Sequence, residues 1–196
     1  MTATVLDLLR HGEPEGGRRY RGHGVDDPLS ETGWAQMWAA VAAMGPGWDR
    51  VVTSPLVRCR AFAEQVAERH GLPLAIEPEI REVGFGIWEG LSPDEVQARY
   101  AGMLAAFRAD PVGARPAGAE PAQAFFDRST GALAAIAKRY AGERVLVVAH
   151  AGTLRAAAGW AVQAPLTEIF RIKVDYAGHV RLRFEAGRPW LDLGPW

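Results

Sequence analysis

Short apolar segments alternate with helical segments along this chain, and this alternation limits the possible folds more than any other feature of the sequence. Residues 4–9 and 145–149 are almost continuously apolar, which is typical of strands buried on both faces of a sheet. Residues 50–53 and 74–76 predict two more short strands. The pattern favours the α/β class, as a three-layer α/β/α sandwich around a mostly parallel central sheet.

Capping residues, glycine and proline mark where the helices begin and end. Ser30 is a suitable N-cap for a helix with apolar residues at 34, 37, 38, 41 and 44, and the Gly-Pro-Gly sequence at 45–47 ends it. Ser54 is expected to cap a second helix with Pro55 at its first position, and Ser92 a third that runs towards residue 100 or beyond. Further helices are expected over residues 125–140 and from 152 to about 162.

The C-terminal part of the chain predicts two closing strands, at residues 169–174 and 180–184, around a turn at 177–178. An apolar tail follows them. It can dock on the body of the protein or on a second subunit, so both a monomer and a homodimer stay open. The apolar residues of this tail are Trp190, Leu191, Leu193 and Trp196.

The size and composition of the chain indicate one globular domain. At roughly 150 residues per domain, 196 residues suggest a single domain over 1–196. The Pro-, Gly- and Ala-rich stretch at 110–121 is interpreted as a surface loop within a substrate-side cap region around 84–125. With 48% hydrophobic and 23% charged residues, the chain is too apolar to be disordered.

Charge and cysteine content exclude several classes of function. The formal net charge of −1 argues against a protein that binds nucleic acid or membrane surfaces through bulk charge. Cys59 is the single cysteine, which excludes an internal disulfide framework and a cysteine-based zinc site. Asp7 interrupts the apolar run at 5–9, so we expect no signal peptide, no spanning helix and a cytoplasmic location.

Side chains with phosphate-binding chemistry follow three of the predicted strands. Arg10 and His11 directly follow the first strand, Arg58 lies in the helix after the second, and His150 follows the strand that ends at 149. The carboxyl ends of parallel strands meet at one edge of a sheet, where ligands bind. Arginine forks and free N–H groups at helix N-termini both suit phosphate oxygens. The sequence therefore predicts a pocket for a phosphoryl group.

A histidine in such a pocket can act as a nucleophile on phosphorus. Neutral His11 would carry the phosphoryl group, while Arg10 and Arg58 stabilise charge on its oxygens. A carboxylic acid must then protonate the leaving oxygen and later activate water. Glu82 follows the third strand near the same edge, and Glu89 in the same stretch is more simply read as a cap or an ion-pair partner.

Residues 10–13 (Arg-His-Gly-Glu) resemble the defining motif of the histidine phosphatase superfamily, also called the phosphoglycerate mutase-like family. The resemblance covers nearly the whole chain. It implies that His11 is the phosphorylated nucleophile and that Arg10, Arg58 and His150 complete the phosphate-binding core. It also favours Glu82 over Glu89 as the acid, within a Glu-x-x-x-Gly-x-Trp-Glu-Gly stretch. The resemblance implies a phosphoglycerate mutase-like fold with no metal and no cofactor.

Two further segments resemble bacterial α-ribazole phosphatases: residues 20–23 (Tyr-Arg-Gly-His) and 27–33 (Asp-Pro-Leu-Ser-Glu-Thr-Gly). Those enzymes remove phosphate from α-ribazole 5′-phosphate or its cobamide phosphate during assembly of the cobalamin nucleotide loop. The chain lacks the longer insertions of the true mutases, which favours hydrolysis over transfer. The further phosphate- or substrate-binding residues implied are Gly17, Tyr20, Gly22, His23 and Ala151.

The chain also departs from the family pattern. Pro14 and Gly17 stand where many members have threonine and asparagine, Ala151 replaces a commoner glycine, and Pro121 replaces a hydroxyl residue at a helix entry. The alternatives are a broad-specificity sugar-phosphate phosphatase, a cofactor-dependent phosphoglycerate mutase, and a non-catalytic binder of phosphorylated ligands. A metallohydrolase is disfavoured, because the sequence has no spaced set such as H-E-x-x-H.

Overall fold

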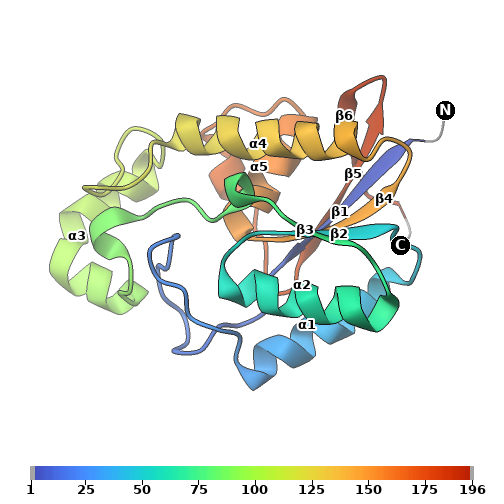
Figure 1. Cartoon of the computed structure of the whole chain (residues 1–196). Helices are drawn as coiled ribbons and strands as arrows, with labels where there is room; N and C mark the ends of the chain where they lie inside the picture. Colours follow the sequence, from blue (N-terminus) through green and yellow to red (C-terminus); the bar gives the residue numbers. More distant parts are fainter. Residues whose placement is uncertain (1–2, 195–196) are drawn as a thin grey trace.

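The computed structural model describes residues 3–194, and a six-stranded mixed sheet lies at its centre (Figure 1). The spatial order is β3-β2-β4-β1-β5-β6; the first four of these strands run parallel, and β5 and β6 are antiparallel to their neighbours. The predicted α/β fold with a mostly parallel sheet is confirmed. The strands are β1 Thr4–Arg10, β2 Arg50–Thr53, β3 Leu74–Ile76, β4 Arg144–Ala149, β5 His179–Glu185 and β6 Arg188–Asp192.

Helices cover both faces of the sheet and make the three predicted layers. α1 (Glu31–Met44) and α2 (Val57–His70) lie on one face, and α4 (Ala122–Arg139) and α5 (Ala151–Ala161) lie on the other (Figure 1). Successive side chains of the central strands enter different cores, since Val147 packs towards α4 and α5 and Val148 towards α1 and α2. This two-sided burial is why residues 145–149 are apolar without interruption.

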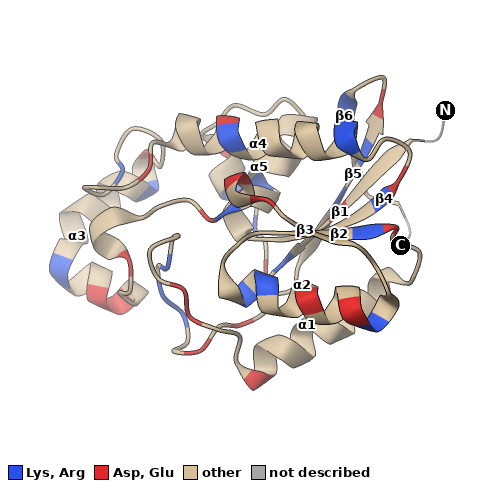
Figure 2. Cartoon of the chain, viewed as in Figure 1, with Lys and Arg blue, Asp and Glu red and all other residues tan. Residues whose placement is uncertain are grey.

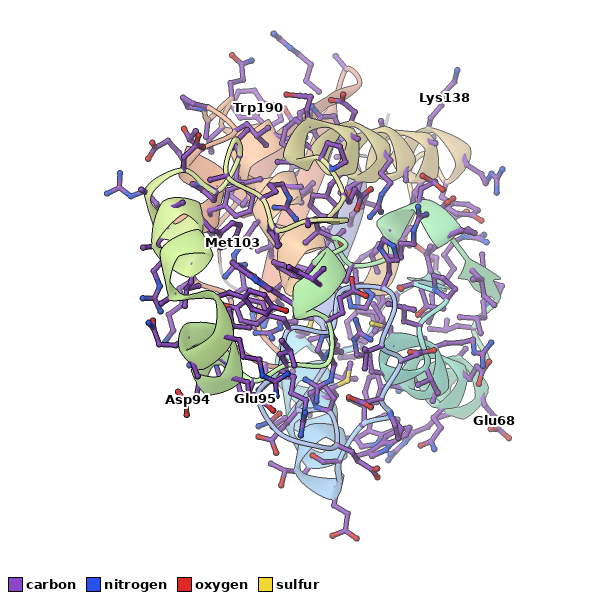
Figure 3. All side chains as sticks on the ribbon, turned by 90° about the vertical axis from the view of Figure 1, so that its left-hand side faces the viewer. Glu68, Asp94, Glu95, Met103, Lys138 and Trp190 are labelled. Atoms are coloured by element: carbon purple, nitrogen blue, oxygen red, sulfur yellow. The ribbon has the colours of Figure 1, made fainter. Side chains whose placement is uncertain are left out.

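Two of the three predicted serine caps are confirmed. Ser30 Oγ accepts the Gly33 N–H at the start of α1, and Ser92 forms a reciprocal capping box with Glu95 at the start of α3 (Pro93–Ala109). Glu95 and its neighbour Asp94 mark this helix start in Figure 3. α3 runs beyond Tyr100, where the backbone leaves helical geometry and the helix kinks.

The third predicted cap is wrong. α2 begins at Val57, so Ser54 and Pro55 precede the helix. Ser54 Oγ instead lies 2.7 Å from Nε2 of His150, and the first free N–H of α2 is taken by Oδ1 of the distant Asp26, 2.7 Å from Val57 N. Ser54 and the first turn of α2 thus bind partners from distant parts of the chain, and these contacts replace the local cap that the Ser-Pro sequence predicts.

The prediction of a strand at 169–174 is also wrong. Residues Glu168–Arg171 form a short 3-10 helix, and the following residues are irregular. Ile169 is buried and packs against Gly159 of α5. The carbonyl oxygens of Ile172 and Val174 accept hydrogen bonds from arginine side chains rather than from a neighbouring strand.

The apolar tail contains a strand that the sequence did not indicate. β6 pairs with β5 at the edge of the sheet; Leu191 packs against the core on the α4–α5 side, while Trp190 points outward and is 58% exposed (Figure 3). Leu193 is exposed after the end of β6, and Trp196 lies outside the described residues. The remaining expected strand, at 180–184, is confirmed as the middle of β5.

The region expected to form a substrate-side cap lies beyond the carboxyl ends of the parallel strands (Figure 1). It contains a 3-10 helix at Gly86–Trp88, then α3, then the loop up to α4. Trp88, Val96 and Leu104 form its own small core, with Tyr20 packed against it. None of the helices among residues 3–194 combines the length and apolarity needed to cross a bilayer.

A fully buried carboxylate in β1 binds side chains from β4, from β5 and from the loop before β2. Asp7 of β1 forms ion pairs with Arg144 and Arg181, both at 2.7 Å, and accepts the indole N–H of Trp48 at 2.8 Å. A buried carboxylate with three donors is satisfied, whereas removal of its charge leaves desolvated cations behind.

We therefore expect Asp7→Asn to lower the free energy of unfolding by about 3 kcal/mol, measured by urea denaturation with tryptophan fluorescence. The matched control is Glu168→Gln, which removes the exposed ion pair with Arg171. The free energy of unfolding of that control should stay within about 0.5 kcal/mol of the value for the unaltered protein. Equal effects of the two substitutions would contradict this account of the buried charge.

Candidate active site

The candidate site is built where β1, β2 and β4 end. Arg10 of β1 is paired with Ala149 of β4, so the residues that follow them, His11 and His150, emerge side by side. Their ring centroids are 5.3 Å apart in an edge-to-face arrangement. Parallel pairing in this register therefore brings together two histidines that are far apart in the sequence, as predicted.

His11 is buried and has a defined tautomer. Its Nδ1 lies 2.7 Å from the carbonyl oxygen of Gly12. A carbonyl oxygen can only accept, so Nδ1 carries the proton and Nε2 keeps its lone pair. Burial, followed by the positive charges of Arg58 and Arg10, holds the pKa of His11 well below its ordinary value. The ring is therefore neutral at physiological pH, which a nucleophilic imidazole requires.

Two guanidinium groups, of the half-buried Arg10 and the buried Arg58, are held beside His11 by backbone carbonyls. Arg10 donates to Val174 O at 2.6 Å and lies over the ring of Tyr176, and Arg58 donates to Gly22 O at 2.7 Å and Val25 O at 3.0 Å. Within residues 3–194, the Nε atoms of Arg10 and Arg58 are buried donors with no hydrogen-bond partner. Two desolvated cations with unused donors form a site for an anion.

His150 occupies the N-cap position of α5 and is fully buried. Its Nε2 lies 2.7 Å from Ser54 Oγ, and the thiol of Cys59 lies 3.6 Å from the same nitrogen. Burial, then the charge of Arg58, lowers the pKa of His150 well below its ordinary value. Burial raises the pKa of Cys59, so this thiol is neutral and donates to Ala149 O at 3.2 Å.

The two carboxylates that the sequence offered as acids have different surroundings. Glu82 Oε1 accepts the N–H of Gly152 at 3.2 Å and of Val83 at 2.9 Å, which places the carboxylate at the N-terminus of α5, the helix that His150 caps. Glu89 instead accepts the N–H groups of Gly24 and Phe85, at 3.0 and 2.8 Å, and so joins two loops. Glu82 therefore lies at the helix that begins beside the two histidines, whereas Glu89 has a structural contact.

The other predicted binding residues take several roles. Gly22 holds Arg58 through its carbonyl; its φ is +54°, and a Cβ there would clash with the Glu89 carboxylate. Gly17 is exposed, and its carbonyl accepts from Arg21. Tyr20 packs against Phe85 and Trp88, so its ring belongs to the small core of the cap region. His23 is exposed, and its Nδ1 lies 3.1 Å from Glu82 O. Ala151 is the first residue of α5.

No large field of a single sign surrounds the site. Lys and Arg alternate with Asp and Glu over the elements seen in Figure 2, in line with the formal net charge of −1. Among residues 3–194, no group of three or more His, Cys, Asp or Glu side chains is arranged to hold a metal ion. The positive charge at His11 comes from arginines near it, chiefly Arg58 and Arg10.

The sequence model of the Histidine phosphatase superfamily (branch 1) matches residues 6–194. The chain belongs to this superfamily. It is 33% identical over 180 residues to a bifunctional protein of Mycobacterium tuberculosis, a match that covers 90% of this chain but spans only about half (49%) of that relative. It is 35% identical over 162 residues to a 2,3-bisphosphoglycerate-dependent phosphoglycerate mutase of Methylobacterium radiotolerans, covering 78% of this chain and 76% of that protein.

The fold is also that of solved members of the superfamily. The structure of a putative α-ribazole-5′-P phosphatase from Escherichia coli K-12 superposes with a TM-score of 0.85 at 27% identity, covering 100% of this chain and 97% of that one. The family and the fold expected from the motif at residues 10–13 are thus confirmed. The matches include proteins named as phosphatases and as mutases, so family membership alone leaves the substrate open.

The structure also brings to this histidine phosphatase site residues that the sequence reading did not include. Tyr176 lies beside His11, with ring centroids 6.0 Å apart, and stacks on Arg10. Arg21 is buried, is paired with Asp27 at 2.8 Å, and adds to the positive field on His11. Arg21 is part of the motif at residues 20–23, so its position in that motif could have indicated a role at the site. Nothing local in the sequence indicates Tyr176, which the turn before β5 carries to the site.

The lowered pKa values of His11 and His150 predict a loss of stability in mild acid. The unfolded chain takes up protons near pH 6.5, whereas the folded protein keeps both rings neutral to a lower pH. Stability is therefore fully present above about pH 6.5 and falls as pH decreases below that value. Each ring adds about 1.4 kcal/mol per pH unit to this slope.

We expect His11→Gln to reduce the slope of unfolding free energy against pH, between about pH 5 and 6, by about 1.4 kcal/mol per unit. Urea titrations at several pH values measure it. The control is His70→Gln, which replaces an exposed histidine at the far end of α2 by the same residue type. An unchanged slope in His11→Gln would mean that this imidazole accepts a proton in the folded protein.

Proposed function

We propose that this chain is a metal-independent phosphomonoesterase that works through a phosphohistidine at His11. The observation that carries the proposal is the pairing of a buried neutral imidazole, whose Nε2 lone pair is free, with two arginines whose buried Nε donors have no partner within residues 3–194. The arginine donors suit an anion with several oxygens, and the imidazole suits an electrophilic centre. A phosphate ester has these two features.

In the proposed first step, Nε2 of His11 attacks phosphorus in line with the ester oxygen. The N–P bond forms as the P–O ester bond breaks, and Glu82 gives its proton to the departing alcohol. Arg10 and Arg58 donate to the non-bridging oxygens, and His150 lies against the same group from the neighbouring strand. These contacts stabilise charge that is spread over the oxygens in the transition state.

In the second step, water replaces the alcohol. Glu82, now a carboxylate, accepts a proton from the water as the water oxygen attacks phosphorus. The N–P bond breaks, its electron pair returns to Nε2, and inorganic phosphate leaves. Glu82 is again protonated and His11 is again neutral, so the cycle closes without a metal or cofactor.

We further propose α-ribazole 5′-phosphate as the substrate, which would place the reaction in the assembly of the cobalamin nucleotide loop. The resemblance of residues 20–23 and 27–33 to bacterial α-ribazole phosphatases supports this, as does the likeness to the Escherichia coli structure. The second candidate is phosphoglycerate mutase activity, which the identity to the Methylobacterium mutase favours. The partner in either case is a small phosphomonoester.

His11→Asn tests the nucleophile. We expect a loss of at least ~10³-fold in phosphate release, because no other group can form the covalent intermediate. Intact-mass analysis of the unaltered protein, quenched during turnover, should find one added phosphoryl group that is lost in acid, and His11→Asn should show none. Turnover by His11→Asn near the unaltered rate would refute the mechanism.

The substrate is tested by phosphate release, with chelator present, from α-ribazole 5′-phosphate, sugar phosphates, phosphoserine and 3-phosphoglycerate. We expect kcat/KM for α-ribazole 5′-phosphate to exceed that of the other substrates by at least ~10-fold. Isomerisation of 3-phosphoglycerate without release of phosphate would identify a mutase. Similar slow hydrolysis of every substrate would support a broad-specificity phosphatase instead.

A further inference from the structure

Arg128 of α4 makes an unusual set of contacts with the segment that carries Glu82. Its Nη1 donates to the carbonyl oxygens of Glu79 and Arg81, at 2.5 and 3.0 Å, and its Nη2 donates to the carbonyl oxygen of Glu82 at 3.2 Å. The side chain is only 10% exposed. One guanidinium thus binds three backbone carbonyls within residues 79–82, the segment whose last residue is the proposed acid, Glu82.

Glu120 completes this arrangement from the loop before α4. Both of its carboxylate oxygens accept from Arg128, at 2.6 and 2.8 Å, and Oε2 also accepts the N–H of Gly84 at 3.2 Å. Burial alone would raise the pKa of Glu120, but the hydrogen bonds and charge of Arg128 lower it, so the carboxylate is ionised. The pair therefore holds the backbone on both sides of Glu82.

A third side chain, that of His23, binds the same segment. Nδ1 of His23 lies 3.1 Å from the Glu82 carbonyl, which can only accept. The Glu82 backbone is thereby held by α4 and by the loop after β1, while its carboxylate points to the N-terminus of α5. This segment has no regular ladder of its own, since it lies between two short 3-10 helices, so side chains supply the restraint that a strand would otherwise provide.

We propose that Arg128 and Glu120 form a positioning pair that fixes the carboxyl group of Glu82 relative to His11 and the leaving oxygen. The proposal rests on the proposed function of Glu82 as general acid and base. The hydrogen bonds of Arg128 among the described residues go to Glu120 and to backbone carbonyls of 79–82, so these bonds act on the chemistry through Glu82, while the charge of Arg128 also adds to the lowering of the His150 pKa. An acid displaced by a fraction of an ångström transfers its proton poorly.

The test uses leaving groups that differ in their need for a proton. An alkyl alcohol leaves phosphorus only when it is protonated, whereas p-nitrophenolate leaves without help. Because kcat/KM reports the steps up to phosphorylation of His11, it isolates the acid role of Glu82 from its later role with water. A purely structural defect lowers kcat/KM for both substrates alike.

We expect Arg128→Met and Glu120→Gln to lower kcat/KM for an alkyl phosphate by ~10²-fold, near the lower end of what a general acid supplies, and for p-nitrophenyl phosphate by less than ~5-fold. The kcat/KM of Arg128→Lys for the alkyl phosphate should lie between those of these variants and that of the unaltered protein. An ammonium keeps the charge but lacks the planar set of donors that binds Glu120 and the carbonyls at the same time. Activity on p-nitrophenyl phosphate serves as the check that each variant is folded.

Arg144 provides a matched control. It also binds a buried carboxylate, Asp7, and donates to two backbone carbonyls, those of Met44 and Pro46, but it lies at the start of β4, at the opposite end of the sheet from the site. Arg144→Met should lower the free energy of unfolding while the ratio of the two kcat/KM values stays as in the unaltered protein.

Glu82→Gln distinguishes failure of this proposal from failure of the proposed function. If Glu82→Gln discriminates strongly between the two leaving groups and the variants at 128 and 120 do not, the positioning pair is refuted while the acid role of Glu82 stands. If Glu82→Gln affects both substrates equally, Glu82 is not the acid and both proposals are overturned. Discrimination in all of these variants supports the positioning pair.

Discussion

The parallel pairing of β1 with β4 is the interaction on which the rest of the site depends. The pairs Arg10–Ala149 and Leu9–Val148 set the register at the ends of both strands, so that His11 and His150 leave the sheet together. A shift of one residue in either strand would move its side chains from one core into the other, where the packing partners differ. The same hydrophobic pattern that stabilises the two cores thus also sets the positions of the two histidines.

Burial of charge gives the site its chemical character. Arg10 and Arg58 are bound by carbonyl groups from separate loops, and their partial or full burial lets each cation act strongly on its neighbours. Desolvation and these charges together keep His11 neutral, and the Gly12 carbonyl selects the tautomer with Nε2 unprotonated. The fold stabilises an arrangement that would be unfavourable in water, and the bound anion would complete it.

The part of the site around Glu82 is organised differently. The histidines follow directly from regular strands, but Glu82 lies on an irregular segment after β3. Its backbone is held by Arg128, Glu120 and His23, and its carboxylate by the N-terminus of α5. Residues from four separate parts of the chain therefore determine where one carboxylate lies, and they also connect the cap region to the chemistry.

The alternation of strands and helices, the caps at Ser30 and Ser92, and the residues that follow the strands are predictable from local sequence. These follow from local patterns of hydrophobicity and from side chains that act on nearby backbone, which a linear sequence records. The motif at residues 10–13 indicated the superfamily. The role of Ser54, the irregular path of residues 168–174 and the strand β6 depend on tertiary contacts. The same holds for the different contacts of Glu82 and Glu89, and for the positions of Tyr176 and Arg128 near the site. Each of these depends on partners far apart in the chain, because a buried donor or acceptor takes whichever partner the packing brings to it.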